Sequence, residues 1–215
     1  MAAPNLGLWL ALFFATGALC HTSEAALPPS DYRLEVVADH AQILERLNAQ
    51  GSFRQAIEQG KLFQRSVSSG ALVSYELAFA YRALGELKPA EEALKEAVAL
   101  DPSLSFAWYD LGELALIAGD RPDAERAFAE AARLRPDHWA GFFRLAELAA
   151  ESGDAERFDA LLTKAIVNGF DLRSVTQDPR WRGWYADPVL GQILRRFLVV
   201  YWRSDVLDAF EAPLQ

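Results

Sequence analysis

The stretch IAGDRPDAERAF, residues 117–128, decides the fold, because two phrases of the same kind flank it. ALGELKPAEEAL covers residues 83–94, and AESGDAERFDALL covers residues 150–162. Each phrase holds a glycine, a polar turn and a run of spaced apolar residues. The glycines at 51, 85, 119 and 153 lie at intervals of 34 residues. A fixed period of this length predicts a repeated supersecondary unit whose copies stack on one another.

The order of residues within each unit predicts two helices joined by a tight turn. A glycine adopts the left-handed conformation that ends a helix without steric cost. Ser52, Asp120 and Asp154 follow three of these glycines, and such side chains cap the start of the next helix. Pro102 and Pro136 stand where the second helix should end, since proline cannot continue it.

Apolar residues in the first half of the third unit recur at three-to-four spacing, as one face of a helix requires. They are Phe106, Trp108, Leu111, Leu114 and Ala115.

The pattern resembles the tetratricopeptide repeat. Residues 105–138 match it best, with Trp108, Leu111, Gly112, Gly119, Ala124, Phe128, Ala131 and Pro136 at that family's spacing. Ala115 replaces the family's tyrosine, which is one departure. The other units are residues 71–104, 139–172 and 37–70, of which the last is the weakest. The resemblance implies an all-α helical-hairpin solenoid of about four helix pairs over residues 37–172.

The segment after the repeats, residues 173–215, predicts a C-terminal cap. It contains Asp178-Pro179 and Asp187-Pro188, which favour turns or helix starts. With Gly169-Phe170 before them, they resemble a segment that often terminates bacterial tetratricopeptide proteins. After Pro188 a helix is expected with one apolar side, formed by Leu190, Ile193, Leu194, Phe197, Leu198 and Tyr201. The alternative is an independent interaction helix.

The N-terminus predicts export. Residues 6–20 form an uncharged, mostly apolar stretch, which is short for a membrane span and suits a secretory signal cleaved after Ala25. We therefore expect a signal peptide or membrane anchor over residues 1–25 and a linker over 26–36, in a periplasmic or cell-envelope protein. An uncleaved anchor, a lipid on Cys20 and a buried N-terminal helix of a cytosolic protein are the alternatives.

Composition excludes several classes of function. The chain has 215 residues, of which 52% are hydrophobic, and a formal net charge of −9. Nucleic-acid binding needs a basic surface, so a nucleic-acid partner is not expected. Membrane contact is expected only through the N-terminal segment, if it is uncleaved or lipidated at Cys20. One cysteine and three scattered histidines predict no metal site.

Motifs for catalysis and cofactors are missing from the sequence. There is no glycine-rich phosphate loop, GxSxG elbow or zinc-protease helix. We therefore expect neither a cofactor nor enzyme activity. His138 is interpreted as a surface or capping residue, and Glu91 with Lys95 as a surface ion pair. Glu113 and Glu147 are the remaining candidates for an acid–base pair, and they are more simply charges at the edge of a groove.

Stacked helix pairs offer a concave surface lined by the first helix of each pair. The positions that face inward in the tetratricopeptide family give a candidate groove for a protein or peptide. Its residues are Leu72, Tyr75, Phe79, Arg82, Phe106, Tyr109, Glu113, Leu116, Phe143 and Glu147. Tyrosine and phenylalanine offer large contact area at low entropic cost. The same aromatic residues could instead pack against other parts of the chain.

These observations predict a non-enzymatic adaptor or scaffold that binds a protein or peptide in the cell envelope. The alternative is a membrane-tethered structural subunit of an envelope assembly that docks through its C-terminal helix.

Overall fold

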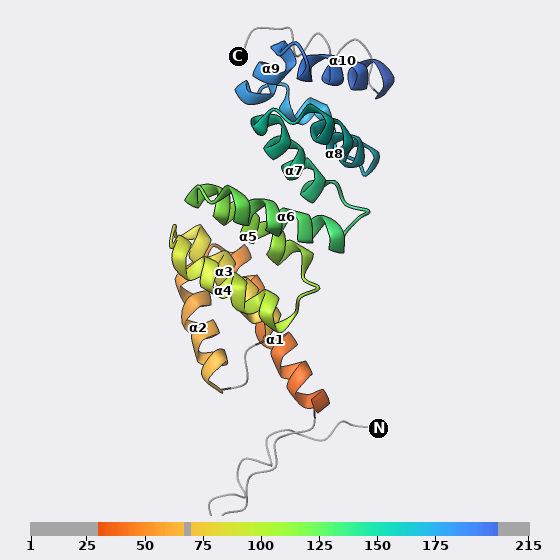
Figure 1. Ribbon diagram of the computed structural model, residues 1–215. Helices are drawn as coiled ribbons and strands as arrows, with labels where there is room; N and C mark the ends of the chain where they lie inside the picture. The colour runs from red at the N-terminus through yellow and green to blue at the C-terminus, as the bar shows by residue number, and fades with distance from the viewer. Residues whose placement is uncertain (1–29, 67–69, 202–215) are drawn as a thin grey trace, which may run out of the picture.

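The computed structural model describes residues 30–66 and 70–201 (Figure 1). Four helix pairs come first in the chain, and a shorter C-terminal group follows. The pairs are α1 (Ser30–Ala49) with α2 (Phe53–Ser66), α3 (Ala71–Ala83) with α4 (Leu87–Leu100), α5 (Ser105–Ala118) with α6 (Arg121–Leu134), and α7 (Trp139–Ser152) with α8 (Ala155–Val167). The C-terminal group is the short 3₁₀ helix η2 (Leu172–Val175), α9 (Pro179–Ala186) and α10 (Leu190–Tyr201).

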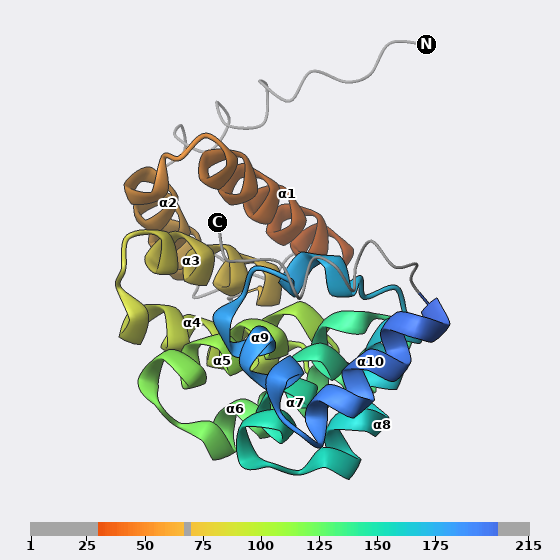
Figure 2. The same ribbon diagram turned by 90° about the horizontal axis from the view of Figure 1, so that it is seen from above.

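The pairs stack in chain order. Each hairpin packs on the next, with α2 on α3, α4 on α5 and α6 on α7. Seen from above, the successive hairpins follow one another around a curve (Figure 2). The predicted all-α solenoid of helix pairs is therefore confirmed. None of the described helices is both long and apolar enough to cross a membrane.

The turns follow the chemistry expected from the sequence. Gly119 ends α5 with a φ of 78°, and Gly153 ends α7 with a φ of 74°, both in the left-handed region. The Asp120 and Asp154 carboxylates accept hydrogen bonds from the backbone N–H groups of Asp123 and Arg157. They satisfy amide groups at the helix start that have no partner within the helix. Capping by Ser52 stays a prediction.

Small residues allow the two helices of a pair to approach closely. Gly112 in α5 faces the fully buried Phe128 of α6, and a Cβ built on Gly112 would lie 2.5 Å from the ring. Ala124 is also fully buried beside Phe128. The hairpin core is therefore shaped by an absent side chain on one helix and a large one on the other.

Helices α9 and α10 begin at the turns that the sequence predicted. Asp178 and Asp187 accept backbone N–H hydrogen bonds at the starts of α9 and α10. Helix α10 packs on α9 and α8, and four of its predicted apolar residues are buried. These are Leu190, Leu194, Phe197 and Leu198.

One boundary differs from the expectations. Residues 30–36, predicted as part of the linker 26–36, belong to α1, which is the longest of the described helices. The period did not predict a helix over residues 30–36, because the first repeat unit begins at residue 37. Residues 1–25, with Cys20, lie outside the described residues.

Candidate functional site

A pocket of about 410 Å³ opens where the first helices of three hairpins meet. It takes residues from α3, α5 and α7, together with the end of α6 and the loop that follows it. They are Tyr75, Ser105, Phe106, Tyr109, Asp110, Ala131, Arg135, His138, Trp139, Ala140 and Gly141. Three residues predicted for the groove, Tyr75, Phe106 and Tyr109, are brought together here.

The walls of this pocket are aromatic and partly open to solvent. The Tyr75 and Phe106 rings meet edge to face at 4.5 Å between centroids, and Tyr109 packs in the same manner on Phe128 at 5.4 Å. Phe106 is 42% exposed. Leu72 and Phe79, also predicted for the groove on α3, are 45% and 38% exposed. Apolar side chains with this much exposed area are candidates for contact with another molecule.

The polar groups of the pocket already have partners in the chain. The Asp110 carboxylate lies 3.0 Å from the Arg82 guanidinium and accepts a hydrogen bond from the Tyr75 hydroxyl. Burial raises the pKa of Asp110, and the pairing with Arg82 and Tyr75 opposes this shift. Burial and the Asp110 charge raise the pKa of Tyr75, so its hydroxyl stays protonated. Arg82, a predicted groove residue, also lies over the Phe79 ring.

The rim of the pocket carries one imidazole. His138 caps α7, because its Nδ1 accepts a hydrogen bond from the Ala140 N–H at 3.3 Å, and its ring stacks on Trp139. The interpretation of His138 as a capping residue is therefore confirmed. Beside it, Arg135 is paired with Asp137.

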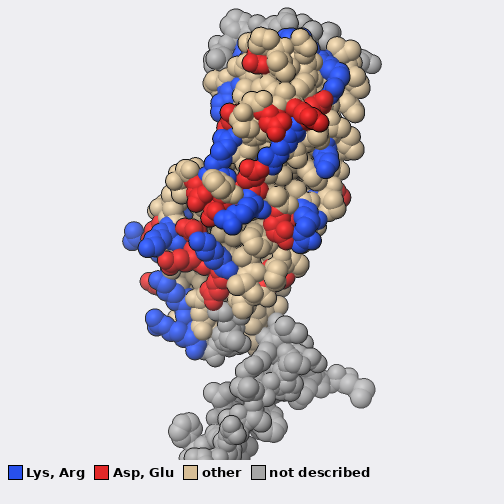
Figure 3. All heavy atoms as spheres, in the orientation of Figure 1, with Lys and Arg blue, Asp and Glu red and all other residues tan. Residues whose placement is uncertain are grey.

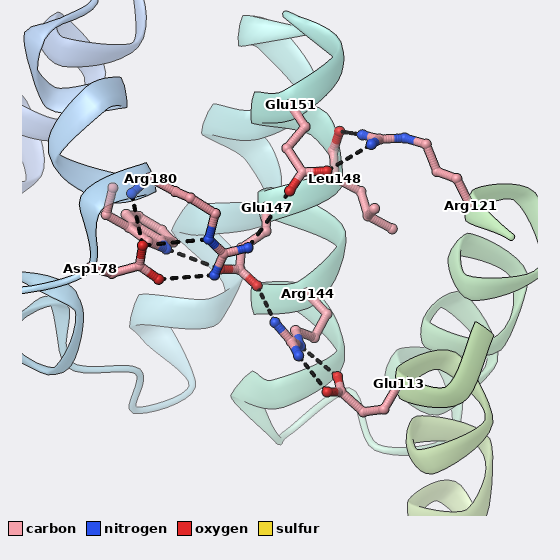
Figure 4. Close-up of polar contacts among 9 residues, drawn as sticks. Glu113, Arg121, Arg144, Glu147, Leu148, Glu151, Asp178 and Arg180 are labelled. Atoms are coloured by element: carbon pink, nitrogen blue, oxygen red, sulfur yellow. Dashed lines mark hydrogen bonds and ion pairs between the residues drawn. The ribbon is translucent and has the colours of Figure 1, made fainter. Parts of the chain in front are cut away.

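The fourth repeat, residues 139–172, differs, because α9 of the same chain lies against it. Glu147 in α7, predicted as a groove-edge charge, is only 4% exposed. Its carboxylate accepts hydrogen bonds from Trp181 Nε1 and Arg180 Nη2, each at 3.0 Å, and pairs with Arg144 (Figure 4). That part of the prediction is wrong, since the carboxylate is enclosed by its own chain.

Phe143 takes part in the same closure. The indole ring of the fully buried Trp181 lies parallel to the Phe143 ring at 5.5 Å, and Phe170 contacts both rings. For Phe143, the structure therefore shows the alternative of packing against the same chain.

Arg144 connects α5, beside the open pocket, to the part of α7 that α9 covers. Its guanidinium pairs with Glu113 of α5 on one side and Glu147 on the other (Figure 4). Although burial alone lowers the pKa of Arg144, hydrogen bonds to both carboxylates raise it overall. Both carboxylates, considered from the sequence as an acid–base pair, accept hydrogen bonds from this one guanidinium. Leu116 is half-buried and packs on the cluster around Phe128.

A polar contact joins each first helix to the next along the solenoid. The Asn48 amide donates to the Glu76 carboxylate between α1 and α3, and Arg82 pairs with Asp110 between α3 and α5. The contacts from Glu113 to Arg144 and from Glu147 to Trp181 continue the series to α9. We call this series the inner polar ladder. Sequence reasoning missed Asp110, Arg144 and Trp181 as its members.

Charges of both signs occur together on one face of the molecule. Acidic and basic side chains are intermixed on the face that Figure 3 presents. Glu91 and Lys95 form the predicted ion pair of neighbouring helical turns. Among the described residues, no group of three or more His, Cys, Asp and Glu side chains could hold a metal ion.

Comparisons with known proteins identify the repeats. Tetratricopeptide-repeat family models match residues 72–104 and 109–169. One crystal structure of MamA protein is 18% identical, covers 82% of this chain and 93% of that chain, and gives a TM-score of 0.63. MamA 41-end from Desulfovibrio magneticus RS-1 is 16% identical, with coverage of 81% and 94% and a TM-score of 0.63.

TTC0263, a thermophilic TPR protein in Thermus thermophilus, is 17% identical, with coverage of 81% and 88% and a TM-score of 0.51. These structures share the fold with this chain. No curated protein matches the sequence.

Proposed function

We propose that this tetratricopeptide-repeat protein is a non-catalytic scaffold, which binds a partner protein in its concave groove. The contact would use the open part of the groove on α3 and α5. The open groove is defined here as Leu72, Tyr75, Phe79, Phe106 and Tyr109.

One observation carries this proposal. Aromatic side chains from three successive repeats surround a pocket of about 410 Å³, and Phe106 keeps nearly half of its surface exposed. Large apolar side chains at the centre of a concave surface are the usual source of binding energy in protein interfaces. The proposal therefore rests on Tyr75, Phe106 and Tyr109, and the exposed Leu72 and Phe79 extend the surface.

The charges of the groove favour an apolar partner segment. Asp110 is paired with Arg82, and Glu113 is paired with Arg144. A charged ligand would have to displace one of these partners, which leaves a partly buried charge unpaired at considerable cost. We therefore expect a partner segment with aromatic or aliphatic side chains and little dependence of binding on salt.

The groove also has a defined end. Trp181 and Arg180 cover Phe143 and Glu147, so the partner segment would stop before Phe143 of α7.

We place this scaffold in the cell envelope, as an exported protein. The support is the apolar stretch of residues 6–20, followed by small residues near Ala25. Intact-mass measurement of the native protein tests the placement. A chain that starts near Ala26 would agree with cleavage, and a lipid mass on Cys20 or a retained N-terminus would indicate a membrane tether.

One observation favours a second function, that of a tethered structural subunit that docks through α10. Val199 and Val200, in the last turn of α10, are 78% and 65% exposed, and Tyr201 beside them is half-exposed. Adjacent apolar side chains with this exposure suit an interface.

The test compares capture of partners from an envelope extract by three full-length proteins. The first is the wild type, and the second carries Leu72→Ser, Phe79→Ser and Phe106→Ser in the open groove. The third is a matched control with three exposed apolar residues outside the groove changed, by Leu62→Ser, Leu100→Ser and Val167→Ser. A partner held by the wild type and the control but lost by the groove variant supports the proposal. Equal capture by all three contradicts it.

A fourth protein, with Val199→Ser and Val200→Ser, separates the two functions. Loss of the partner in this variant alone assigns docking to α10.

A further inference from the structure

A second hollow of about 500 Å³ lies among α4, α5 and α6, and it shares no lining residue with the groove pocket. Its floor is apolar, with Val98, Trp108, Leu111, Ala115 and Ala127. Its rim is charged, with Glu91, Lys95, Asp123, Arg126 and Glu130.

The hollow exists because two positions of the repeat both hold alanine. At the position equivalent to Ala115, the preceding repeat has Tyr81. At the position equivalent to Ala127, the following repeat has Leu161. Each neighbouring repeat has one large and one small residue at these two positions, since Tyr81 is paired with Ala93 and Leu161 with Ala149.

The large residues fill the equivalent space in their own repeats. Tyr81 is half-buried and packs on the core beside α4, and Leu161 packs on the cores of α6 and α8. The repeat at residues 105–138 lacks both side chains, so its space stays open to solvent.

The preceding repeat also shows how an aromatic ring sits in this space. Lys61 Nζ lies 5.6 Å from the centroid of the Tyr81 ring. The residue one repeat period after Lys61 is Lys95, on the rim of the hollow. The face of an aromatic ring attracts an ammonium group at this distance. The hollow therefore keeps the cation of the Tyr81 arrangement and lacks only the ring.

We propose that this hollow binds a tyrosine side chain of a partner protein. The phenol ring would lie on Trp108 and Leu111, in the place that Tyr81 takes one repeat earlier, with Lys95 over its face. The three rim carboxylates, Glu91, Asp123 and Glu130, are paired with Lys95, Arg126 and Arg133. A paired carboxylate keeps further lone pairs, so each could still accept a hydrogen bond from the tyrosine hydroxyl. The indole N–H of Trp108 already donates to the Pro102 carbonyl at 3.0 Å, and this fixes the ring as part of the floor.

A larger side chain at Ala115 or Ala127 should occupy the hollow and compete with a bound tyrosine ring. Ala127→Leu introduces the residue that the following repeat has there, and Ala115→Tyr introduces that of the preceding repeat. Both side chains are tolerated at these positions elsewhere in the same solenoid, so the variants should fold. Ala129→Leu is the matched control, because Ala129 is exposed on the same helix and does not line the hollow.

The experiment titrates p-cresol, the side-chain analogue of tyrosine, into the full chain and follows the alanine methyl signals by NMR. We expect saturable ring-current shifts at Ala115 and Ala127 in the wild type. Ala127→Leu and Ala115→Tyr should weaken binding by about tenfold or more, because the added carbons occupy the guest's volume. Ala129→Leu should keep the wild-type affinity. Absence of shifts in the wild type, or equal binding by all variants, overturns the proposal.

Two further probes test the chemistry of the guest. Equal binding of 4-methylcyclohexanol, which has the same size without an aromatic ring, would overturn the aromatic specificity. N-acetyl-tyrosinamide should bind with shifts at the same methyl groups, and N-acetyl-leucinamide should not. If p-cresol binds and N-acetyl-tyrosinamide does not, the site takes free phenols and the assignment to a protein side chain is wrong. The open-groove variant should bind p-cresol normally, which separates this site from the proposed function.

Discussion

The third and fourth repeats use the same positions for different purposes. Tyr109 and Glu113 in α5 are equivalent to Phe143 and Glu147 in α7, one repeat period later. The first pair lies beside an open pocket, with Glu113 partly exposed. The second pair is covered by α9, which inserts Trp181 and Arg180 against it. Facing inward in a repeat therefore does not make a residue available to a partner, because availability depends on what the next element does.

The largest difference in stability between the two regions should follow the removal of an aromatic side chain from each. We expect Trp181→Ala to lower the free energy of unfolding by about 3–5 kcal/mol, since it empties a fully buried site and takes a donor from Glu147. Phe106→Ala should cost less than about 1 kcal/mol, because much of that ring is already in water. Urea unfolding followed by circular dichroism measures both. Similar costs would remove the distinction between a closed and an open region.

The second-largest difference should be in the stability lost when each of the equivalent glutamates, Glu147 and Glu113, is removed. Glu147→Ala removes a buried carboxylate that accepts from Arg144, Arg180 and Trp181, so we expect a loss of about 3 kcal/mol. Glu113→Ala should cost about 1 kcal/mol, because that carboxylate is partly exposed and has fewer partners.

Glu91→Ala, at an exposed ion pair, is the control and should change the free energy of unfolding by less than about 0.5 kcal/mol. A greater loss for Glu113→Ala than for Glu147→Ala would reverse the comparison.

The pH dependence of two aspartates should have opposite signs. Hydrogen bonds from Arg180 hold the pKa of the Asp178 carboxyl below its ordinary value of 3.8. Its charge therefore stabilises the folded state above that pH, and the stabilisation is lost as pH falls through the lower, folded-state pKa. We expect Asp178→Asn to cost about 1 kcal/mol or less at neutral pH and nothing at the acid end.

The contribution of Asp110, in the open region, to stability should change with pH in the opposite direction. Burial raises the pKa of its carboxyl above 3.8, so the folded state prefers the protonated form. The wild type should therefore gain stability relative to Asp110→Asn as pH falls through the raised pKa towards 3.8. Unfolding curves of the three proteins across the acid range measure both slopes. Parallel slopes for the two variants would contradict the assigned environments.

The smallest effect concerns salt. Because the charges of the open groove are paired within the chain, we expect partner affinity to change less than about threefold between roughly 50 and 500 mM NaCl. Titration calorimetry with the captured partner gives this dependence. A steep loss of affinity with salt would show that the partner contacts charges and not the aromatic surface.

Local chemistry explains why so much of the fold could be predicted. The turns depend on residues within them, namely Gly119, Gly153, Asp120 and Asp154. The fixed period then gives the spacing at which such turns recur. Asp178 likewise starts a helix by bonding to an amide two residues away. Such features need no knowledge of distant residues.

The closure of the fourth repeat was harder to predict, because it depends on where a later segment lies. In the sequence, Trp181 stands out only as a large apolar residue shortly after the Asp178-Pro179 turn. Yet its contact Glu147 lies 34 residues before it, which is the repeat period. Extending the period beyond residue 172 would have placed Trp181 at the inward position equivalent to Glu147. The contacts of Asp110 and Arg144 could not be predicted without the fold, because their partners come from neighbouring repeats.

The inner polar ladder bears on how the groove could widen. Each of its contacts joins one first helix to the next, beside apolar clusters that also extend across the hairpins. To separate two neighbouring first helices, a partner would have to break the contact between them. Several donors converge on the buried Glu147 carboxylate, whereas Asp110 lies beside the open groove. We therefore expect the spacing of α3 and α5 to yield to a partner more readily than that of α7 and α9.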